Sequence, residues 1–260
     1  MNDSNANNPD GNVIFSGTKE VAENLKFNEA GLQEWFGDSI SSAGKILKIA
    51  QFKGGQSNPT YKITTEKQQF VLRRKPPGIL LPSAHAVDRE YKVMTALQQT
   101  EVPVPKTYGL CEDEDVIGTP FFVMDFLDGN IYWDLLLGDK SPAERSDIYA
   151  SKNNVIAQLH MVDYESVGLS DYGKPGNYVA RQVSRWTKQY IASETQDIPA
   201  MNKLIDWLPS NIPDEDETSI VHGDYRLDNM VFNAANNVMG VLDWELSTLG
   251  HPIADFNYHC

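Results

Sequence analysis

The chain has 260 residues, of which 41% are hydrophobic and 22% charged, and its formal net charge is −14. This is the composition of a globular protein with one large domain or two lobes. The acidic balance argues against nucleic acids and anionic membranes as partners, because both bind clustered Lys and Arg. The two cysteines, Cys111 and Cys260, form no CxxC pair, so neither a disulfide framework nor a zinc site is indicated. The polar start MNDSNANNPDGN does not resemble a signal peptide, and no run of about 18 apolar residues predicts a membrane span. We therefore expect a cytoplasmic protein.

The first part of the chain predicts a small sheet with helices. Residues 1–27 are expected to form a flexible tail, and residues 28–37 have the apolar spacing of a short amphipathic helix. A second helix is expected to begin at Ser83, because apolar side chains recur at helical spacing from Ala86 to Leu97. The predicted strands, separated by polar or glycine-containing turns, cover residues 46–49, 60–63, 70–73, 107–111 and 121–126.

After Gly129 the pattern becomes mainly helical. Ser141 is an N-cap candidate, with Pro142 at the first helical position and Glu144 at the third, which is the pattern of a capping box. Further apolar stripes at helical spacing cover residues 148–162, 179–190 and 201–208. The last part predicts a hairpin of short strands with its turn at residues 233–237.

Two motifs carry the chemistry: HGDYRLDN at residues 222–229 and VLDWE at residues 241–245. Asp224 directly follows a β-type segment, from which its carboxylate can accept the proton of a hydroxyl as a general base. Asn229 and Asp243 supply an amide oxygen and a carboxylate, the kind of ligands that magnesium binds together with nucleotide phosphates. Because a short hairpin separates the two aspartates, both can reach one cleft.

Each of these three residues also has a purely structural interpretation. Asp224 can cap a turn, Asn229 can cap a turn or a helix, and Asp243 can form an Asx turn at the end of its strand. The spacing of all three together favours the catalytic interpretation. Within the first motif, we interpret His222 as a structural residue and Asp228 as a solvated or structural carboxylate.

The two motifs resemble the catalytic and metal-binding loops of the aminoglycoside phosphotransferase and choline kinase-like family, relatives of the protein kinases. Protein kinases have HRD and DFG at these places, whereas HGD and LDW favour the small-molecule branch. The resemblance implies an α+β, protein kinase-like bilobal fold. Its nucleotide-binding lobe, an antiparallel sheet with a helix, would be residues 28–129, and its mainly helical lobe residues 130–260. It also implies Asp224 as the catalytic base and Asn229 and Asp243 as ligands of Mg²⁺, with ATP or GTP as the phosphoryl donor.

The same resemblance extends upstream to the residues that would hold the nucleotide phosphates. The loop that covers the phosphates would consist of Gly54, Gly55, Gln56, Ser57 and Asn58. Arg73 stands where protein kinases have a lysine; Lys75 shares its face of the strand, and Arg74 faces the other way. Glu90 matches the helix glutamate that pairs with that cation, so Arg73 is its expected partner. Arg226 either approaches the γ-phosphate or pairs with an acid.

Residues 122–129 look like the family's hinge, where backbone groups would bind adenine and where Met124 and Phe126 would contact the nucleotide. Asp255 resembles the buried aspartate that braces the catalytic loop. The match covers roughly residues 45–260. Chains of this family normally continue with more helices, so we expect either a truncated product or an unusually small carboxy-terminal lobe.

A finer resemblance concerns the phosphate acceptor. KPPG at residues 75–78, LPSAHAVDREY at residues 81–91 and the segment 181–190 are similar to the kinase-like domains associated with acyl-CoA dehydrogenases. That subgroup implies a hydroxyacyl compound or its CoA thioester as the acceptor. The acidic net charge would instead suit a cation, but net charge is not a local property, so the resemblance is the stronger indication.

We therefore predict an ATP- and magnesium-dependent phosphotransferase that acts on a small-molecule hydroxyl, with no nucleic acid or membrane partner. The sequence leaves the oligomeric state open. One alternative is a non-catalytic pseudokinase that binds a nucleotide or metabolite, which the missing lysine motivates. Another is a kinase for aminoglycosides or other amino alcohols. A metal-dependent hydrolase using Asp224 and Asp243 would require further His and carboxylate ligands.

Overall fold

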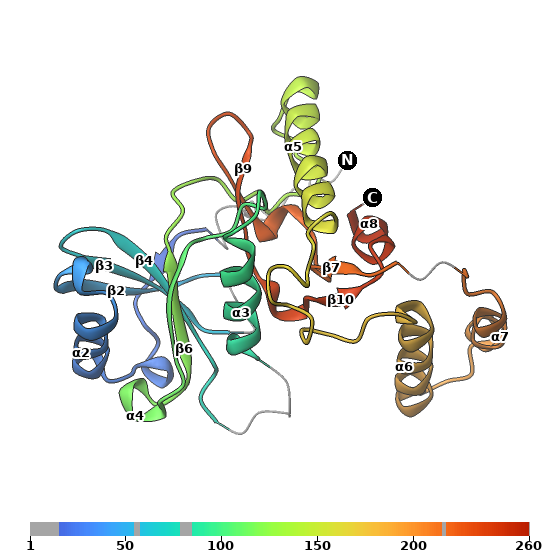
Figure 1. Ribbon diagram of the computed structural model, residues 1–260, viewed down its shortest axis with the longest axis horizontal. Coiled ribbons are helices and arrows are strands. Elements are labelled where there is room, and N and C mark those ends of the chain that lie inside the picture. Colours follow the sequence, from blue (N-terminus) through green and yellow to red (C-terminus); the bar gives the residue numbers. More distant parts are fainter. Residues whose placement is uncertain (1–15, 55–57, 79–84, 215–216, 260) are drawn as a thin grey trace, which may run out of the picture.

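A computed structural model describes residues 16–54, 58–78, 85–214 and 217–259 (Figure 1). The first half of the chain forms an antiparallel sheet with the strand order β1-β2-β3-β4-β6-β5. Its strands are β1 (Thr18–Lys19), β2 (Ile46–Phe52), β3 (Thr60–Thr65), β4 (Gln69–Arg74), β5 (Thr107–Cys111) and β6 (Phe121–Asp125). All of them except β1 were expected from apolar runs bounded by turn residues.

Helices cover both faces of this sheet (Figure 1). They are α2 (Glu29–Ser39) and α4 (Glu114–Ile117) on one face and α3 (Val87–Leu97) on the other. Strand alternation decides which side chains of β4 each face receives. Phe70 and Leu72 pack in the apolar cluster under α2, whereas Val71 packs in the cluster with α3. By the same alternation, Arg73 lies on the α3 face of the sheet, toward the second half of the molecule.

Two expectations about the first half are corrected. Within residues 1–27, predicted as a flexible tail, Thr18–Lys19 pairs with β2 and Glu23–Leu25 forms a 3₁₀ turn (η1), so that prediction is wrong for these elements. Helix α3 begins at Val87 and not at Ser83, which lies outside the described residues. The backbone of His85 has φ 59°, a left-handed conformation that a right-handed helix cannot contain.

The second half is mainly helical and contains two small sheets. Its long helix begins with the capping box predicted at Ser141 and Glu144. The helices are α5 (Pro142–His160), α6 (Tyr178–Ser193), α7 (Pro199–Trp207) and α8 (Ile253–His259), with 3₁₀ turns η3 (Leu208–Ser210), η4 (Leu227–Asn229) and η5 (Trp244–Leu246). Strand β7 (Ser219–Val221) pairs with β10 (Thr248–Gly250), and β8 (Met230–Phe232) pairs with β9 (Val238–Val241). Helices α6 and α7 lie at the end farthest from the six-stranded sheet (Figure 1).

The two halves are joined by a shared apolar core and by Arg89 of α3. One cluster of buried side chains contains Val71 and Met94 from the first half together with Ile220 and Trp244 from the second. Arg89 donates hydrogen bonds through Nη2 to the carbonyl oxygens of Tyr172 at 2.8 Å and Ser247 at 3.3 Å. These contacts fix α3 against the second half and therefore position the cleft between them. Among the described residues, no helix is both long and apolar enough to cross a membrane.

Candidate active site

The loop that carries the first motif is held from below by Asp255. This carboxylate is fully buried and accepts backbone hydrogen bonds from His222 and Gly223, each at 2.7 Å. Its Oδ2 also lies 3.2 Å from Nε2 of His160, at the end of α5. Charge-assisted bonds to two successive N–H groups hold the backbone in place just before Asp224. The structure thus places Asp255 where the family resemblance implied, and His160 is a further support that the sequence did not reveal.

His222 and Gly223 shape the same loop. Nε2 of His222 lies 2.8 Å from the carbonyl oxygen of Leu242, so it donates; Nδ1 accepts from the backbone N–H of Asp224 at 3.2 Å. Burial lowers the pKa of His222, which agrees with a neutral ring whose Nδ1 is an acceptor. Gly223 has φ 82°, and a Cβ there would lie 2.8 Å from the carbonyl oxygen of Leu246. Both residues therefore have structural roles, as interpreted for His222.

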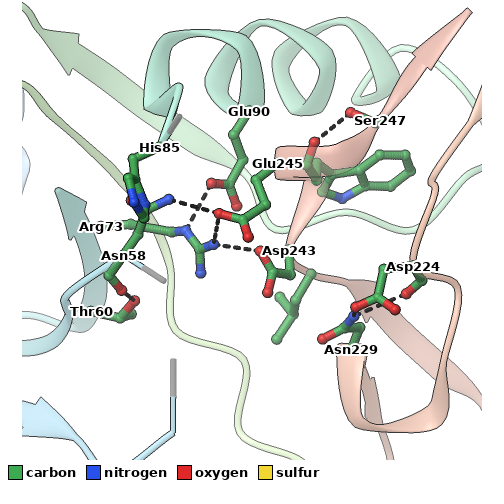
Figure 2. Close-up of polar contacts among 12 residues, drawn as sticks. Asn58, Thr60, Arg73, His85, Glu90, Asp224, Asn229, Asp243, Glu245 and Ser247 are labelled. Atoms are coloured by element: carbon green, nitrogen blue, oxygen red, sulfur yellow. Dashed lines mark hydrogen bonds and ion pairs between the residues drawn. The ribbon is translucent and has the colours of Figure 1, made fainter. Parts of the chain in front are cut away.

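Asp224 and Asn229 are bonded directly to each other. Nδ2 of Asn229 donates to the backbone oxygen and to Oδ2 of Asp224, both at 2.9 Å (Figure 2). Because the amide nitrogen is used in this way, the amide oxygen is the atom of Asn229 that can bind a cation. The side chain of Asp224 is 25% exposed, so a substrate can reach it.

Arg226 contacts two aspartates of its own loop. Its Nε lies 3.4 Å from Oδ1 of Asp224, and its Nη2 pairs with Asp228. Of the two roles left open by the sequence, pairing with an acid is the one seen in this structure. Asp228 is half-buried by this arrangement, in agreement with a structural role.

Asp243 follows β9 in an unusual backbone conformation. Its φ and ψ are 62° and 59°, in the left-handed region that non-glycine residues rarely adopt. Such strained residues persist where the surrounding structure holds them, commonly at functional sites. The carboxylate of Asp243 forms an ion pair with Nη2 of Arg73, and Figure 2 shows it between Arg73 and the Asp224–Asn229 pair. The hairpin thus places Asp243 in the cleft, on the side of the Asp224–Asn229 pair.

Arg73 is surrounded by three carboxylates. Its Nε lies 2.8 Å from Glu90, and its Nη2 contacts Asp243 and lies 3.6 Å from Glu245. Burial acts to lower the pKa of Arg73, but the combined attraction of these carboxylates raises it above its ordinary value. Burial raises the pKa of Glu90 to about 7 against the effect of Arg73, and the nearby carboxylates of Asp243 and Glu245 add to the increase. The predicted partnership of Arg73 with Glu90 is therefore present.

Glu245 is a residue of this cluster that the sequence analysis missed. Its Oε2 accepts a hydrogen bond from Nδ2 of Asn58 at 3.2 Å, and Oδ1 of Asn58 lies 3.1 Å from Nδ1 of His85 (Figure 2). Asn58 is fully buried, so both ends of its amide have partners. The available signal was an acidic residue two positions after Asp243, beside the buried Trp244.

A cavity of about 360 Å³ lies between the sheet and the second half. Of the predicted nucleotide residues, Gly54, Arg73, Glu90, Met124 and Phe126 line it, and so do the predicted metal ligands Asn229 and Asp243. Gly55, Gln56 and Ser57 lie outside the described residues. Asp224 does not line the cavity but is joined to it through Asn229. Asn58 reaches the polar end of the cavity through Glu245.

The walls of the cavity are chemically divided. One part is apolar and includes Val71, Met124, Leu127, Val231 and Leu242, whereas Arg73, Glu90, Asn229 and Asp243 form a polar end. Lys62 is a second cation in the wall, with Nζ 3.7 Å from the ring centroid of Phe126. This division suits a ligand with a flat apolar ring and a charged group at the opposite end.

The comparison of this chain with known proteins agrees with the geometry. A family model described as a phosphotransferase enzyme family matches residues 48–260. Acyl-CoA dehydrogenase family member 10 of Mus musculus is 51% identical over 215 residues, and acyl-CoA dehydrogenase family member 11 of Homo sapiens is 47% identical over 249 residues. These matches cover 82% and 92% of this chain but only 20% and 32% of the two relatives. The chain therefore spans less than a third of either relative.

Solved structures show the same fold. A putative aminoglycoside phosphotransferase from Ralstonia eutropha JMP134 is 54% identical, with a TM-score of 0.82 over 90% of this chain and 70% of that chain. The GDP complex of an aminoglycoside 2′-phosphotransferase has a TM-score of 0.66 at 15% identity, over 89% of this chain and 77% of that one. These similarities confirm the predicted protein kinase-like fold.

Proposed function

The chain belongs to the phosphotransferase enzyme family, and on that premise we propose that it transfers the γ-phosphoryl group of ATP to a hydroxyl of a small molecule. The observation that carries this proposal is the arrangement at the polar end of the cavity. There, Asn229 lines the cavity and bonds to Asp224. Asp243 also lines the cavity and pairs with the buried cation Arg73. The residues proposed as general base, metal ligands and phosphate-binding cation thus form two bonded pairs, Asp224 with Asn229 and Asp243 with Arg73, and both pairs reach the same cavity.

Magnesium fits the donor set of this network. Asn229 and Asp243 offer an amide oxygen and a carboxylate in the wall of one cavity, and magnesium needs few protein ligands when phosphates and water complete its coordination. Within the described ranges, no cluster of three or more His, Cys, Asp or Glu residues is arranged to hold a metal by itself. When bound, the metal would neutralise charge on the phosphates of the nucleotide.

The residues of this chain would position the acceptor, accept its proton and bind the phosphates. Asp224 orients the hydroxyl of the acceptor and accepts its proton as the oxygen attacks the terminal phosphate. Asn229 holds the Asp224 carboxylate in place through its amide nitrogen. Arg73 offers its guanidinium to the phosphates, while Glu90 fixes Nε of that group from the α3 side. The apolar wall between Met124 and Leu242 receives the adenine ring.

The acceptor we propose is a hydroxyacyl compound, free or as its CoA thioester. This proposal is supported by the relatives that are 51% and 47% identical to the chain. Both are named acyl-CoA dehydrogenase family members, and the chain is similar to one part of each. The 54% identical structure is described as a putative aminoglycoside phosphotransferase, so amino alcohols must also be tested as acceptors.

The test is phosphoryl transfer to a panel of hydroxyacyl-CoA esters, free hydroxy acids and aminoglycosides, with phosphorylated product detected by mass spectrometry. The wild-type protein should phosphorylate a hydroxyacyl acceptor, and Asp224→Asn should lower kcat by about 10²–10⁴-fold with its folding unchanged. Thermal shifts with ATP and GTP, each with and without magnesium, should show a magnesium-dependent stabilisation that Asp243→Ala removes. Unchanged transfer by Asp224→Asn would refute the assignment, and nucleotide binding without transfer to any acceptor would instead favour a pseudokinase.

A further inference from the structure

Helix α6 and the residues just before it differ in charge from the rest of this acidic chain. Residues 172–193 contain no Asp or Glu, although the chain as a whole has a net charge of −14. The cations of this segment are Lys174, Arg181, Arg185 and Lys188. A local group of like charges creates a positive potential that attracts anions to that surface.

Three of these cations share one face of α6. Arg181, Arg185 and Lys188 recur at spacings of four and three residues, which places them on one side of a helix. Together with Asn177, Ala180 and Ser184 they line a shallow hollow. We call these three cations the α6 cation face.

Two members of the α6 cation face are open to a ligand, and the third is held at its edge by backbone carbonyls. Arg185 and Lys188 are exposed. Arg181 donates hydrogen bonds to the carbonyl oxygens of Gly176 and, at 2.6 Å, of Lys174, so its guanidinium is held in one place. In the part of the chain that the structure describes, none of the ion pairs formed by carboxylates involves a member of this face. The face is therefore not neutralised by neighbouring acids.

The helix that carries the α6 cation face packs with its first turn against β10, which pairs with β7. Tyr178, in the first turn of α6, packs its ring closely on Gly250 of β10. A Cβ added at Gly250 would lie 2.8 Å from this ring. That Cβ would also lie 2.9 Å from the side chain of Val221, the last residue of β7, after which the loop to Asp224 begins. Figure 1 shows α6 beside the β7–β10 pair. The first turn of α6 is thus fixed against the strand after which the loop to Asp224 begins, and an acceptor that binds both sites would run along this side of the protein.

We propose that the α6 cation face binds the phosphate groups of the acceptor, and that the acceptor is therefore a hydroxyacyl thioester of CoA. This rests on the proposed function, in which Asp224 acts on a hydroxyacyl compound. Arg binds phosphate through paired N–H donors and Lys binds it as a point charge, so the two residue types together suit a ligand with several phosphates. A cationic amino alcohol would be repelled from the same face, and a free hydroxy acid would leave it unused.

The first experiment measures binding of CoA itself by isothermal titration calorimetry, with magnesium and a non-hydrolysable ATP analogue present to occupy the nucleotide cavity. CoA should bind the wild-type protein, and Arg185→Glu and Lys188→Glu should each weaken binding by about tenfold. The matched control is Lys203→Glu on α7, an exposed lysine with the same charge change, which should leave binding unchanged. Absence of CoA binding by the wild-type protein, or equal binding by all variants, would overturn the proposal.

The second experiment compares a hydroxyacyl-CoA with the same hydroxyacyl group on pantetheine, which has no phosphates. The CoA ester should have a KM lower by about tenfold, and Arg185→Glu should remove this advantage with little change in kcat. Equal KM values in the wild-type protein would overturn the α6 proposal while leaving the proposed function intact. If CoA binds through α6 but neither acceptor is phosphorylated, the proposed function fails and the phosphate site stands.

Discussion

The side-chain amide of Asn58 donates a hydrogen bond to Glu245 at 3.2 Å, although 187 residues separate them in the chain. Since Nδ2 of Asn58 is the donor in this bond, its Oδ1 accepts, and His85 therefore donates from Nδ1. The same Glu245 carboxylate lies 3.6 Å from Nη2 of Arg73. One acid thus ties the end of the predicted phosphate loop and the start of α3 to the buried cation.

Substitutions of Glu245 should change nucleotide binding more than the chemical step. We expect Glu245→Ala to raise the KM for ATP by about tenfold, because Asn58 and Arg73 both lose a partner. Glu245→Gln should have a smaller effect, since its amide oxygen can still accept from Asn58 but carries no charge for Arg73. Steady-state kinetics with varied ATP at saturating acceptor give both constants. A fall in kcat at unchanged KM in both variants would contradict this positioning role.

Removing Arg73 should destabilise the protein strongly. Its side chain is 7% exposed and Glu90 is 1% exposed, so Arg73→Met leaves a buried carboxylate without its cation. Loss of one partner of a buried ion pair typically costs about 3–5 kcal/mol. The double variant Arg73→Met with Glu90→Leu should recover part of this loss, because it removes the uncompensated acid as well. Urea denaturation of both variants measures the two free energies of unfolding, and equal values for the single and double variants would refute this explanation.

Glu90 should make the stability of the nucleotide-free protein depend on pH. Its pKa is raised by burial from the ordinary 4.5 to about 7. Between these values the folded protein binds more protons at this site than the unfolded chain does. The Glu90 contribution to the free energy of unfolding should therefore be fully present below about pH 4.5 and be lost as the pH rises through about 7.

The variant Glu90→Gln isolates this contribution, because it has no proton to exchange. Urea denaturation of the wild-type protein and the variant at pH 5 and pH 8 gives the free energy of unfolding of each. The wild-type protein should lose more stability than the variant between these pH values. Parallel behaviour of the two proteins would show that Glu90 is ionised throughout this range.

The sequence predicted the parts of this molecule that depend on local pattern. The capping box at Ser141 is a local signal for the start of a helix, and strand alternation is enough to put Arg73 and Arg74 on opposite faces of β4. The motif around Asp224 is short, so the partnership of this residue with Asn229 follows from a single loop. Such features need no knowledge of how distant segments pack.

The features that the sequence did not predict depend on contacts between distant segments. Glu245 acquires its role only because the loop after β9 meets Asn58 and Arg73 across the cleft. Helix α3 begins late because His85 turns left-handed where it contacts Asn58. No periodicity reports such contacts, since each depends on how segments far apart in the sequence pack together. Lys62 was missed for the same reason, as its place in the cavity wall depends on the neighbouring Phe126.

Asp255 should control catalysis and stability without controlling nucleotide binding. Asp255→Ala leaves the buried N–H group of His222 and the partly buried N–H group of Gly223 without an acceptor, and an unsatisfied buried group costs about 1–3 kcal/mol. Asp255→Asn keeps the shape of the side chain but replaces one acceptor oxygen with a donor that faces an N–H group. We therefore expect both variants to be less stable and to have a lower kcat, because the backbone just before Asp224 is released.

The magnesium-dependent thermal shift by ATP separates this role from a direct role in binding. Asn229 and Asp243 do not contact Asp255, so the shift should persist in Asp255→Asn while kcat falls. The matched control is Asp147→Asn on α5, an exposed aspartate in the helix that also carries His160, and it should leave stability, kcat and the thermal shift unchanged. If the thermal shift disappears together with kcat in Asp255→Asn, Asp255 supports the whole nucleotide site and not only the loop before Asp224. The expected difference between catalysis and nucleotide binding would then be wrong.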